Sequence, residues 1–460
     1  ARIQNQIVTT NGQTYNDFVV LGSNTQLSGR NITFNASVDG AYNLNINDAG
    51  LTRFYGEVGS SIPLYDLNLT SLNGINLYNT LIHTSGAQRY QGSVLLTRAI
   101  SFKGSDIEFD STLDGEFEIS FSDNSQITFA GDVGIIQPIS TILLGADNVV
   151  HFNAPIFKVA GDLVLVGNVY VGANVEVSSL TGSIYDFAPI DGVTEKSYDL
   201  TLSATTGDVL LDGGIGSKSI LNNLTINANK LYLNADVSTA VAQTYNASTE
   251  VGTLGYDGFN LPTLESLLPS IPYLNLGVGF VKNADTSYLI TLLSQDPEIT
   301  FTGPINDNTS NTHTLVVMAL ADPGATSPHL HFYNGVGTTK PLYSFVVVTQ
   351  QTPTTGTITI GGDVSTFMNQ LYDTGTFIVD NSTVTTLYSD VGGIYITAAY
   401  GVMPNWITVD YSYGNESVIN INEGLNQIGG TVRGAPSGSE ANDWAAASTL
   451  IVMHRSEFSS

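Results

Sequence analysis

Short runs of alternating apolar and polar residues cover most of the chain, and these runs end at Gly or Asn. Residues 163–172 and 224–234 are two examples. A period of two with a turn signal after about 6 to 10 residues predicts half-buried β-strands. Helical periodicity is nearly absent, and its two best candidates are residues 263–268 and 364–372, each long enough for about two turns. The pattern therefore predicts an all-β protein.

Many of these strands belong to a sequence repeat. Residues 13–59 align without a gap with residues 88–134, at a constant shift of 75 positions. Within each copy a shorter shift of 20 joins one phenylalanine to the next. The landmarks that the two copies share are Gly29 and Gly104, Phe34 and Phe109, Asp39-Gly40 and Asp114-Gly115, Phe54 and Phe129, and Pro63 and Pro138. Self-similarity at a fixed period is typical of repeat architectures.

Parts of the repeat return further along the chain. The tetrapeptide of residues 13–16 recurs unchanged at residues 243–246, and the glycine-containing element of residues 54–64 recurs at 332–342. In this downstream copy the two phenylalanines, Phe301 and Phe332, are 31 positions apart instead of 20. We therefore expect roughly 11 extra residues to form a loop. The two candidate positions for that loop are residues 306–311 and 322–327.

The repeats also suggest how the chain is divided. We expect one β-helical region over residues 1–348, with the 75-residue repeat at 9–83 and 84–144 and related coils at 296–348. Residues 349–460 differ in texture, and we interpret them as a continuing β-rich region that serves as a cap or an assembly module.

A period near 20 made of short strands and Gly or Asn corners predicts a chain that coils and stacks on itself. The predicted fold is a right-handed parallel β-helix, a solenoid in which Phe34 lies under Phe54 and Phe109 under Phe129. Stacked coils are about 4.8 Å apart, so roughly 20 turns would give a rod of about 100 Å.

The composition excludes several classes of function. The 460 residues include 14 Lys and Arg against 41 Asp and Glu, a formal charge of 14 − 41 = −27. Because the basic residues are scattered singly, a nucleic-acid partner is excluded. The chain has no Cys, so thiol chemistry and cysteine-bound metals are excluded as well. No apolar run approaches the roughly 18 residues of a spanning helix, so we expect no membrane-spanning segment.

One His-x-His pair is a candidate metal site. His329 and His331 share one face of a predicted strand, and Asp322 lies upstream. Two imidazoles with a carboxylate would suit Zn²⁺ or Cu²⁺. However, Phe332 aligns with an inward phenylalanine of the first copy, so both histidines should face solvent. We interpret them as an exposed pair and assign no metal ligands.

Two pairs of carboxylates are candidates for glycosidase chemistry, which needs two carboxyl groups about 5 to 10 Å apart. They are Asp106 with Glu108, and Glu116 with Glu118. The first copy of the repeat lacks them, so we interpret them as surface charge and assign no catalytic residue. Alternation places these pairs on the outward face, opposite Ile107, Phe109, Phe117 and Ile119.

No cofactor is assigned, and calcium is kept only as an alternative ligand of the acidic rows. The glycine-rich residues 213–216 lack the Asp of the calcium-binding nonapeptide repeat. No phosphate loop, dinucleotide fingerprint or Ser-His-Asp order is visible.

The repeat resembles that of a known family. The residues that carry the resemblance are Gln13 to Asp17, Val19 to Gly22, Leu27 to Gly29, Ile32 to Phe34 and Val38 to Gly40. They are similar to the repeats of very large secreted bacterial exoproteins, the filamentous-haemagglutinin-like adhesins and related autotransporter passengers. The resemblance covers residues 9–144 and 296–348 and implies a secreted β-helical adhesin. The Asn-Pro-Asn motifs of that family's secretion module are absent, so the chain is interpreted as a passenger or processed fragment.

We therefore expect an extracellular or cell-surface protein without enzymatic activity. The leading hypothesis is a surface adhesin passenger, a biofilm-matrix component or the subunit of a self-assembling fibre. Expected partners are further copies of the chain, a surface carbohydrate or a host-cell receptor. The alternative is a β-helix polysaccharide lyase or hydrolase, or a phage-spike-like depolymerase.

Overall fold

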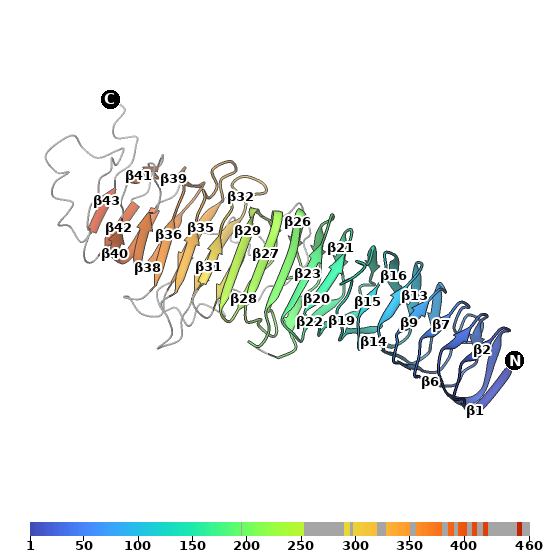
Figure 1. Cartoon of the computed structure of the whole chain (residues 1–460). Helices are drawn as coiled ribbons and strands as arrows, with labels where there is room; N and C mark the ends of the chain where they lie inside the picture. The colour runs from blue at the N-terminus through green and yellow to red at the C-terminus, as the bar shows by residue number, and fades with distance from the viewer. Residues whose placement is uncertain are drawn as a thin grey trace. The chain divides into compact units, whose positions relative to one another are not determined.

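The computed structural model describes eleven segments of the chain, all of them built from strands, bends and turns without a helix (Figure 1). The described residues are 1–194, 196–252, 289–294, 298–319, 328–349, 356–379, 385–390, 394–402, 407–411, 417–421 and 449–452. Parallel strands stack into a β-solenoid of about 15 turns, which confirms the predicted fold class. The chain divides into two compact units, Ala1–Leu221 and Asn222–Ser460, which are described separately below.

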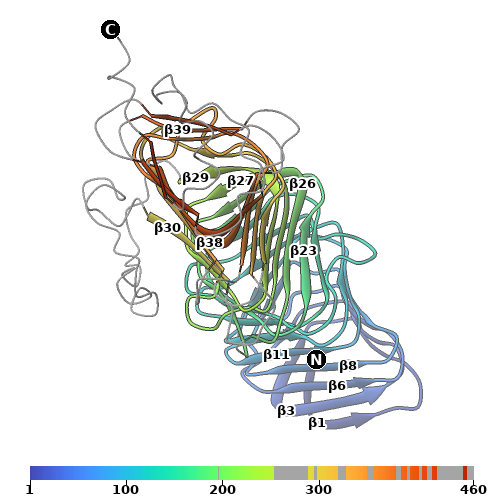
Figure 2. The same ribbon diagram turned by 90° about the vertical axis from the view of Figure 1, so that its left-hand side faces the viewer.

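Unit 1 is built from three parallel ladders of strands that the chain visits in turn. Figure 2 shows β1, β3, β6, β8 and β11 of the first ladder side by side. The first ladder consists of β1 (Arg2–Val8), the second half of β3 (Val19–Gly29), β6 (Leu44–Asp48), β8 (Leu67–Ser71), β11 (Ala87–Gln91), β14 (Asp106–Phe109), β17 (Gln126–Phe129), β19 (Val149–Phe152), β22 (Asn168–Val171) and β25 (Ile190–Gly192).

The other two ladders of unit 1 combine short strands with isolated bridges at Val58 and Val133. The second ladder contains β2 (Gln13–Tyr15), β4 (Ile32–Phe34), β7 (Thr52–Phe54), β9 (Ile75–Leu77), β12 (Val94–Leu96), β15 (Leu113–Asp114), β20 (Ile156–Val159), β23 (Val175–Ser179) and the first half of β26 (Leu200–Leu211). The third ladder contains the first half of β3, β5 (Val38–Asp39), β10 (Leu81–His83), β13 (Ile100–Lys103), β16 (Glu118–Phe121), β18 (Thr141–Leu143), β21 (Leu163–Leu165), β24 (Ile184–Asp186) and the second half of β26.

Unit 2 repeats this arrangement with longer strands, several of which bend and so belong to two ladders. Its parallel pairing continues past residue 348, through β36, β38, β40 and β42. The last strand, β43, pairs antiparallel with β42. The strands are β27 (Leu224–Leu233), β28 (Val237–Thr239), β29 (Ala242–Val251), β30 (Leu289–Ser294), β31 (Glu298–Phe301), β32 (Ile305–Asp307), β33 (Thr314–Ala319), β34 (His329–Phe332), β35 (Ser344–Val348), β36 (Thr357–Ile360), β37 (Val364–Thr366), β38 (Gln370–Val379), β39 (Thr385–Ser389), β40 (Ile394–Val402), β41 (Ile407–Tyr411), β42 (Ser417–Ile421) and β43 (Thr449–Val452).

Stacked aromatic rings fill the interior where the repeat is best preserved. Phe34 and Phe54 are register partners with ring centroids 5.0 Å apart, and Phe109 and Phe129 are partners at 5.8 Å. All four side chains are buried, which confirms the predicted ladder. Burying an aromatic side chain removes a large apolar area from water, so these stacks stabilise the coil strongly.

The 75-residue repeat is not a whole number of turns. Tyr15 lies in the second ladder of unit 1, whereas its equivalent in the next copy, Tyr90, lies in the first ladder. From Tyr15 to Tyr90 the chain advances by eleven ladder positions, where each position is one strand or isolated bridge. Three positions complete a turn, so one copy is three turns and two thirds of a turn. Successive copies therefore place the same side chains on successive faces of unit 1.

Each copy contains a corner at which a glycine adopts the left-handed conformation. Gly59, for example, has a φ of 69° and donates its N–H to the Val38 carbonyl, and the Asp39 carboxylate accepts from the N–H of Ser61. This backbone conformation favours Gly because other residues pay a steric penalty there. The four corners of this kind are Gly59 with Asp39, Gly134 with Asp114, Gly216 with Asp191, and Gly337 with Asn306.

Two expectations about the coil were wrong. The solenoid has about 15 turns rather than roughly 20, because register partners are 20 residues apart at Phe34 and Phe54 but 31 apart at Phe301 and Phe332. The predicted helix at residues 364–372 is instead β37 and the start of β38. Tyr372 there is fully buried. The other helix candidate, 263–268, lies outside the described residues.

Candidate functional site

The His-x-His pair lies on β34 as predicted. Leu330 and Phe332 are buried, while His329 is exposed and His331 is half buried. The two imidazole rings are stacked with centroids 5.8 Å apart. Burial lowers the pKa of His331, and the neighbouring His329 acts in the same direction against the Glu298 carboxylate. Asp322 lies outside the described residues, and within them no group of three or more His, Asp or Glu could hold a metal ion.

Asp106 and Glu108 face outward from β14, as predicted, but they do not stand alone. Arg89 on the neighbouring strand β11 contacts both, with Nη2 2.5 Å from Asp106 Oδ2 and Nε 2.9 Å from Glu108 Oε2. Burial raises the pKa of Glu108, and the Arg89 charge opposes this effect. Arg89 was not identified from the sequence, although a shift of one turn, 108 − 89 = 19 residues, places it opposite Glu108.

The second carboxylate pair is fully on the surface, and one prediction about it was wrong. Glu116 and Glu118 are both exposed, and Ile119 is buried as expected. Phe117, however, is 37 % exposed instead of facing the interior. Its N–H donates to the Gly115 carbonyl in a tight turn, so strand alternation begins only at Glu118.

A polar cluster with the pattern Thr-x-x-x-Gln-x-Tyr recurs four times, and three of the four copies are fully buried. In the second copy, Gln88 Nε2 donates to the carbonyl of Lys103 at 2.7 Å and to Thr84 Oγ1 at 3.2 Å. The Tyr90 hydroxyl donates to Gln88 Oε1 at 2.8 Å, and burial raises the pKa of Tyr90 well above its usual value. The four clusters are Thr9, Gln13 and Tyr15; Thr84, Gln88 and Tyr90; Thr239, Gln243 and Tyr245; and Thr366, Gln370 and Tyr372.

This cluster explains the recurring tetrapeptide of the sequence. Each Gln donates from Nε2 to a backbone carbonyl of the following turn, so the side chain links two turns of the coil. The cluster at Gln370 was missed because residues 364–372 were considered a helix candidate. The Thr four residues before the Gln was the signal that could have identified it.

The glycine-rich residues 213–216 also have a structural role. Gly216 has a φ of 71° and donates its N–H to the Ile190 carbonyl. The Asp191 carboxylate accepts from the N–H groups of Lys218 and Ser219. These contacts match those of the other three corners. The segment is thus a further copy of the corner element, while calcium binding by the acidic rows stays a prediction.

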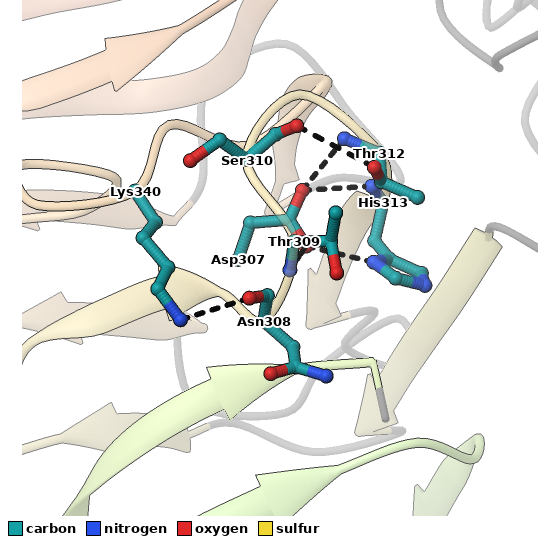
Figure 3. Close-up of polar contacts among 7 residues, drawn as sticks. All are labelled: Asp307, Asn308, Thr309, Ser310, Thr312, His313 and Lys340. Carbon is teal, nitrogen blue, oxygen red and sulfur yellow. Dashed lines mark hydrogen bonds and ion pairs between the residues drawn. The ribbon is translucent and has the colours of Figure 1, made fainter. Parts of the chain in front are cut away.

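A further buried polar cluster lies in the loop that follows β32 (Figure 3). Asp307 is fully buried, and its Oδ2 accepts from the N–H groups of Thr312 at 2.7 Å and His313 at 3.0 Å. Its Oδ1 accepts from the N–H of Thr309 at 3.2 Å and lies 2.7 Å from His313 Nδ1. A carboxylate only accepts, so Nδ1 carries the proton in this contact.

The Asp307 loop coincides with the first of the two predicted insertions, whereas residues 322–327 lie outside the described residues. Lys340 holds it from the next turn, since Nζ donates to the Asn308 carbonyl at 2.9 Å. The His313 ring lies against Gly252, where a Cβ would come within 2.3 Å of it. The Asp307 carboxylate bonds to Thr309, Thr312 and His313 of its own loop, which is typical of a carboxylate that fixes a loop conformation.

Replacing Asp307 by Asn should lower the free energy of unfolding by about 2 kcal/mol, because the amide has one acceptor oxygen instead of two and leaves buried N–H groups unpaired. Urea unfolding measures the loss, and amide hydrogen exchange at Thr312 and His313 locates it. The exposed Asp147 changed to Asn is the control and should have no such effect. Equal losses in the two variants would contradict a structural role for the Asp307 bonds.

Searches of protein-family models, curated proteins and solved structures found no match to this chain. The adhesin resemblance therefore stays a prediction from the sequence. Among the described residues there is no helix that is long and apolar enough to cross a membrane.

Proposed function

We propose that the protein is an extracellular, non-enzymatic β-helical protein with a structural or adhesive role, either a surface adhesin passenger or the subunit of a fibre. The observation that carries this proposal is how the recurring polar side chains are used. Gln88 and Tyr90 bond to each other and to the coil backbone, and Asp114 caps the backbone of the next turn. The residues that repeat from copy to copy therefore maintain the coil.

The surface chemistry agrees with this proposal. Inward positions hold the aromatic and aliphatic side chains, while Asp and Glu are mostly at outward positions and corners. A net charge of −27 keeps such a surface soluble and repels like-charged copies. Any assembly would thus favour contacts through uncharged Asn and Thr rows or through shielding cations.

The alternative function is cleavage of a polysaccharide, and the Arg89 cluster is the observation that favours it. Asp106 and Glu108 on β14 combine with Arg89 to give two carboxylates and a cation on one outward face. A carboxyl group with a raised pKa, such as Glu108, is the usual general acid of a glycosidase. Arg89, however, already bonds both carboxylates, which is also typical of a surface ion pair.

One experiment distinguishes the two functions. The purified chain and its Glu108→Gln variant are incubated with a panel of acidic and neutral polysaccharides, and new reducing ends are measured. In parallel, electron microscopy and sedimentation follow assembly as concentration rises. We expect no cleavage by either protein, and assembly or glycan retention by both. Cleavage that Glu108→Gln abolishes would establish the alternative. Monodisperse particles that retain no glycan would overturn the proposed role.

A further inference from the structure

Eleven ladder positions after Tyr90 the chain reaches Leu165 on β21, so the turns from β21 to the corner at Gly216 form a third structural copy of the repeat in unit 1. This copy has a buried carboxyl group in place of the aromatic stack. Asp186 at the end of β24 is the register partner of Leu165 on β21 and of Leu211 on β26. Counted in ladder positions, it occupies the position that Phe34 and Phe109 occupy in the first two copies. Where those copies stack three aromatic rings, this one therefore stacks Leu, Asp and Leu.

The surroundings of Asp186 do not compensate an ionised carboxylate. The residue has 0 % of its surface exposed, and neither carboxylate oxygen has a hydrogen-bond partner in the described part of the chain. The N–H groups of Ala188 and Gly213 lie close to the carboxyl without completing a hydrogen bond. An ionised carboxylate that is buried and unpaired is costly, so the group is held in its neutral form.

The neighbouring elements offer no cation. None of β21, β24 and β26 contains a Lys or Arg. The charged group that acts on Asp186, Asp212 directly after β26, is an acid and also disfavours ionisation of Asp186. The remaining titratable residues on these elements are Tyr185, which faces outward on β24, Asp208 on β26, and Asp162 at the corner before β21.

We propose that the protonation state of Asp186 controls the local stability of unit 1. The turns formed by β21, β24 and the second half of β26 stay closed while Asp186 is protonated and open locally when it ionises. Three aromatic rings at this position would be indifferent to pH. Because Asp186 stands between Leu165 and Leu211, the stability of this section of the coil depends on pH. Acidification stabilises these turns against local opening, and alkalinisation destabilises them.

The sign follows from proton linkage. Burial raises the pKa of Asp186 well above its usual value, and Asp212 adds to this, against the opposing N–H groups. An unfolded chain would lose the proton near pH 4, whereas the folded chain keeps it to a much higher pH. The folded state binds more protons between these two pKa values, so stability falls with rising pH across that interval and is constant above it.

Peptide-level hydrogen exchange of the full chain tests the proposal. Peptides covering β21, β24 and β26 are compared at pH 5 and pH 8, after correction for the intrinsic pH dependence of amide exchange. We expect at least a tenfold loss of protection at pH 8 in the wild type and no loss in Asp186→Leu. The exposed Glu116→Gln should behave like the wild type. Equal protection of the wild type at both pH values would overturn the proposal.

A second variant separates ionisation from poor packing. Asp186→Asn keeps the size and polarity of the side chain but cannot ionise, so its protection should be the same at both pH values even if it is low. A pH-dependent loss in Asp186→Asn would also contradict the proposal. Peptide resolution is needed because unit 2 contains a half-buried carboxyl, Asp236, whose pKa is raised to about 6 by partial burial against a bond from the N–H of Thr291.

Discussion

Replacing Phe109 by Ala should lower the free energy of unfolding by about 3 to 5 kcal/mol, the usual cost of removing a fully buried aromatic ring and leaving a cavity. The ring is stacked between Tyr90 and Phe129, with centroid distances of 4.8 and 5.8 Å, and meets the edge of Phe102 at 5.4 Å. The solenoid cannot collapse around the gap, because the stacks above and below fix the spacing of the turns. Urea unfolding followed by circular dichroism measures the effect.

Phe117→Ala is the matched control for this variant. The strand pattern of the sequence placed both phenylalanines inside, but Phe117 is 37 % exposed whereas Phe109 is fully buried. Its replacement should change the free energy of unfolding by about 0.5 kcal/mol or less, as for most surface substitutions. Comparable losses in Phe109→Ala and Phe117→Ala would contradict the assignment of inward and outward faces.

Gly134→Ala is the second large expected effect, a loss of about 3 kcal/mol. The φ of Gly134 is 67°, a conformation that costs an L-residue about 1 to 2 kcal/mol. An added Cβ would also lie 2.3 Å from the Lys158 carbonyl oxygen, so the backbone of the adjoining turn would have to move. Thermal and urea unfolding of the purified variant measure the change.

Gly161→Ala provides the comparison, since Gly161 has no positive φ and the nearest atom to its added Cβ is 3.3 Å away. We expect a loss of about 1 kcal/mol or less there. If the two variants were equally stable, the corner at Gly134 would not need its glycine, and the recurrence of this corner in four copies would have another cause.

The sequence predicted the class of fold because burial in a β-solenoid is periodic in two ways. Alternation along each strand assigned inward and outward positions, as at Leu330 and His331, and the shift of 20 paired Phe34 with Phe54 correctly. Both signals are local or nearly local in sequence. The inward position of Phe117 was wrong because a turn reset the alternation, and a turn is specified by backbone geometry rather than by hydrophobicity.

The polar contacts were harder to predict than the core. Arg89 pairs with Asp106 and Glu108 across one turn, and Asp307 bonds a loop whose shape depends on the strands around it. Such contacts join residues whose separation is set by the length of the turn, and that length varies along the chain. The buried position of Asp186 could not be predicted from the sequence for a related reason. Only the register of β21, β24 and β26 shows that Asp186 occupies the position of a phenylalanine.

One 75-residue copy of the repeat is not a whole number of turns, and this determines how a duplication within the gene would change the protein. Duplication of one 75-residue copy in unit 1 should preserve the strand register at the junction, because residues 13–59 and 88–134 align without a gap. It would also add three turns and two thirds, so the later faces of unit 1 would rotate by two thirds of a revolution about the coil axis, which equals one third in the opposite sense. Recombination between copies could thus turn a different side of the same surface toward a partner without altering a single codon elsewhere, and three such events would restore the original orientation.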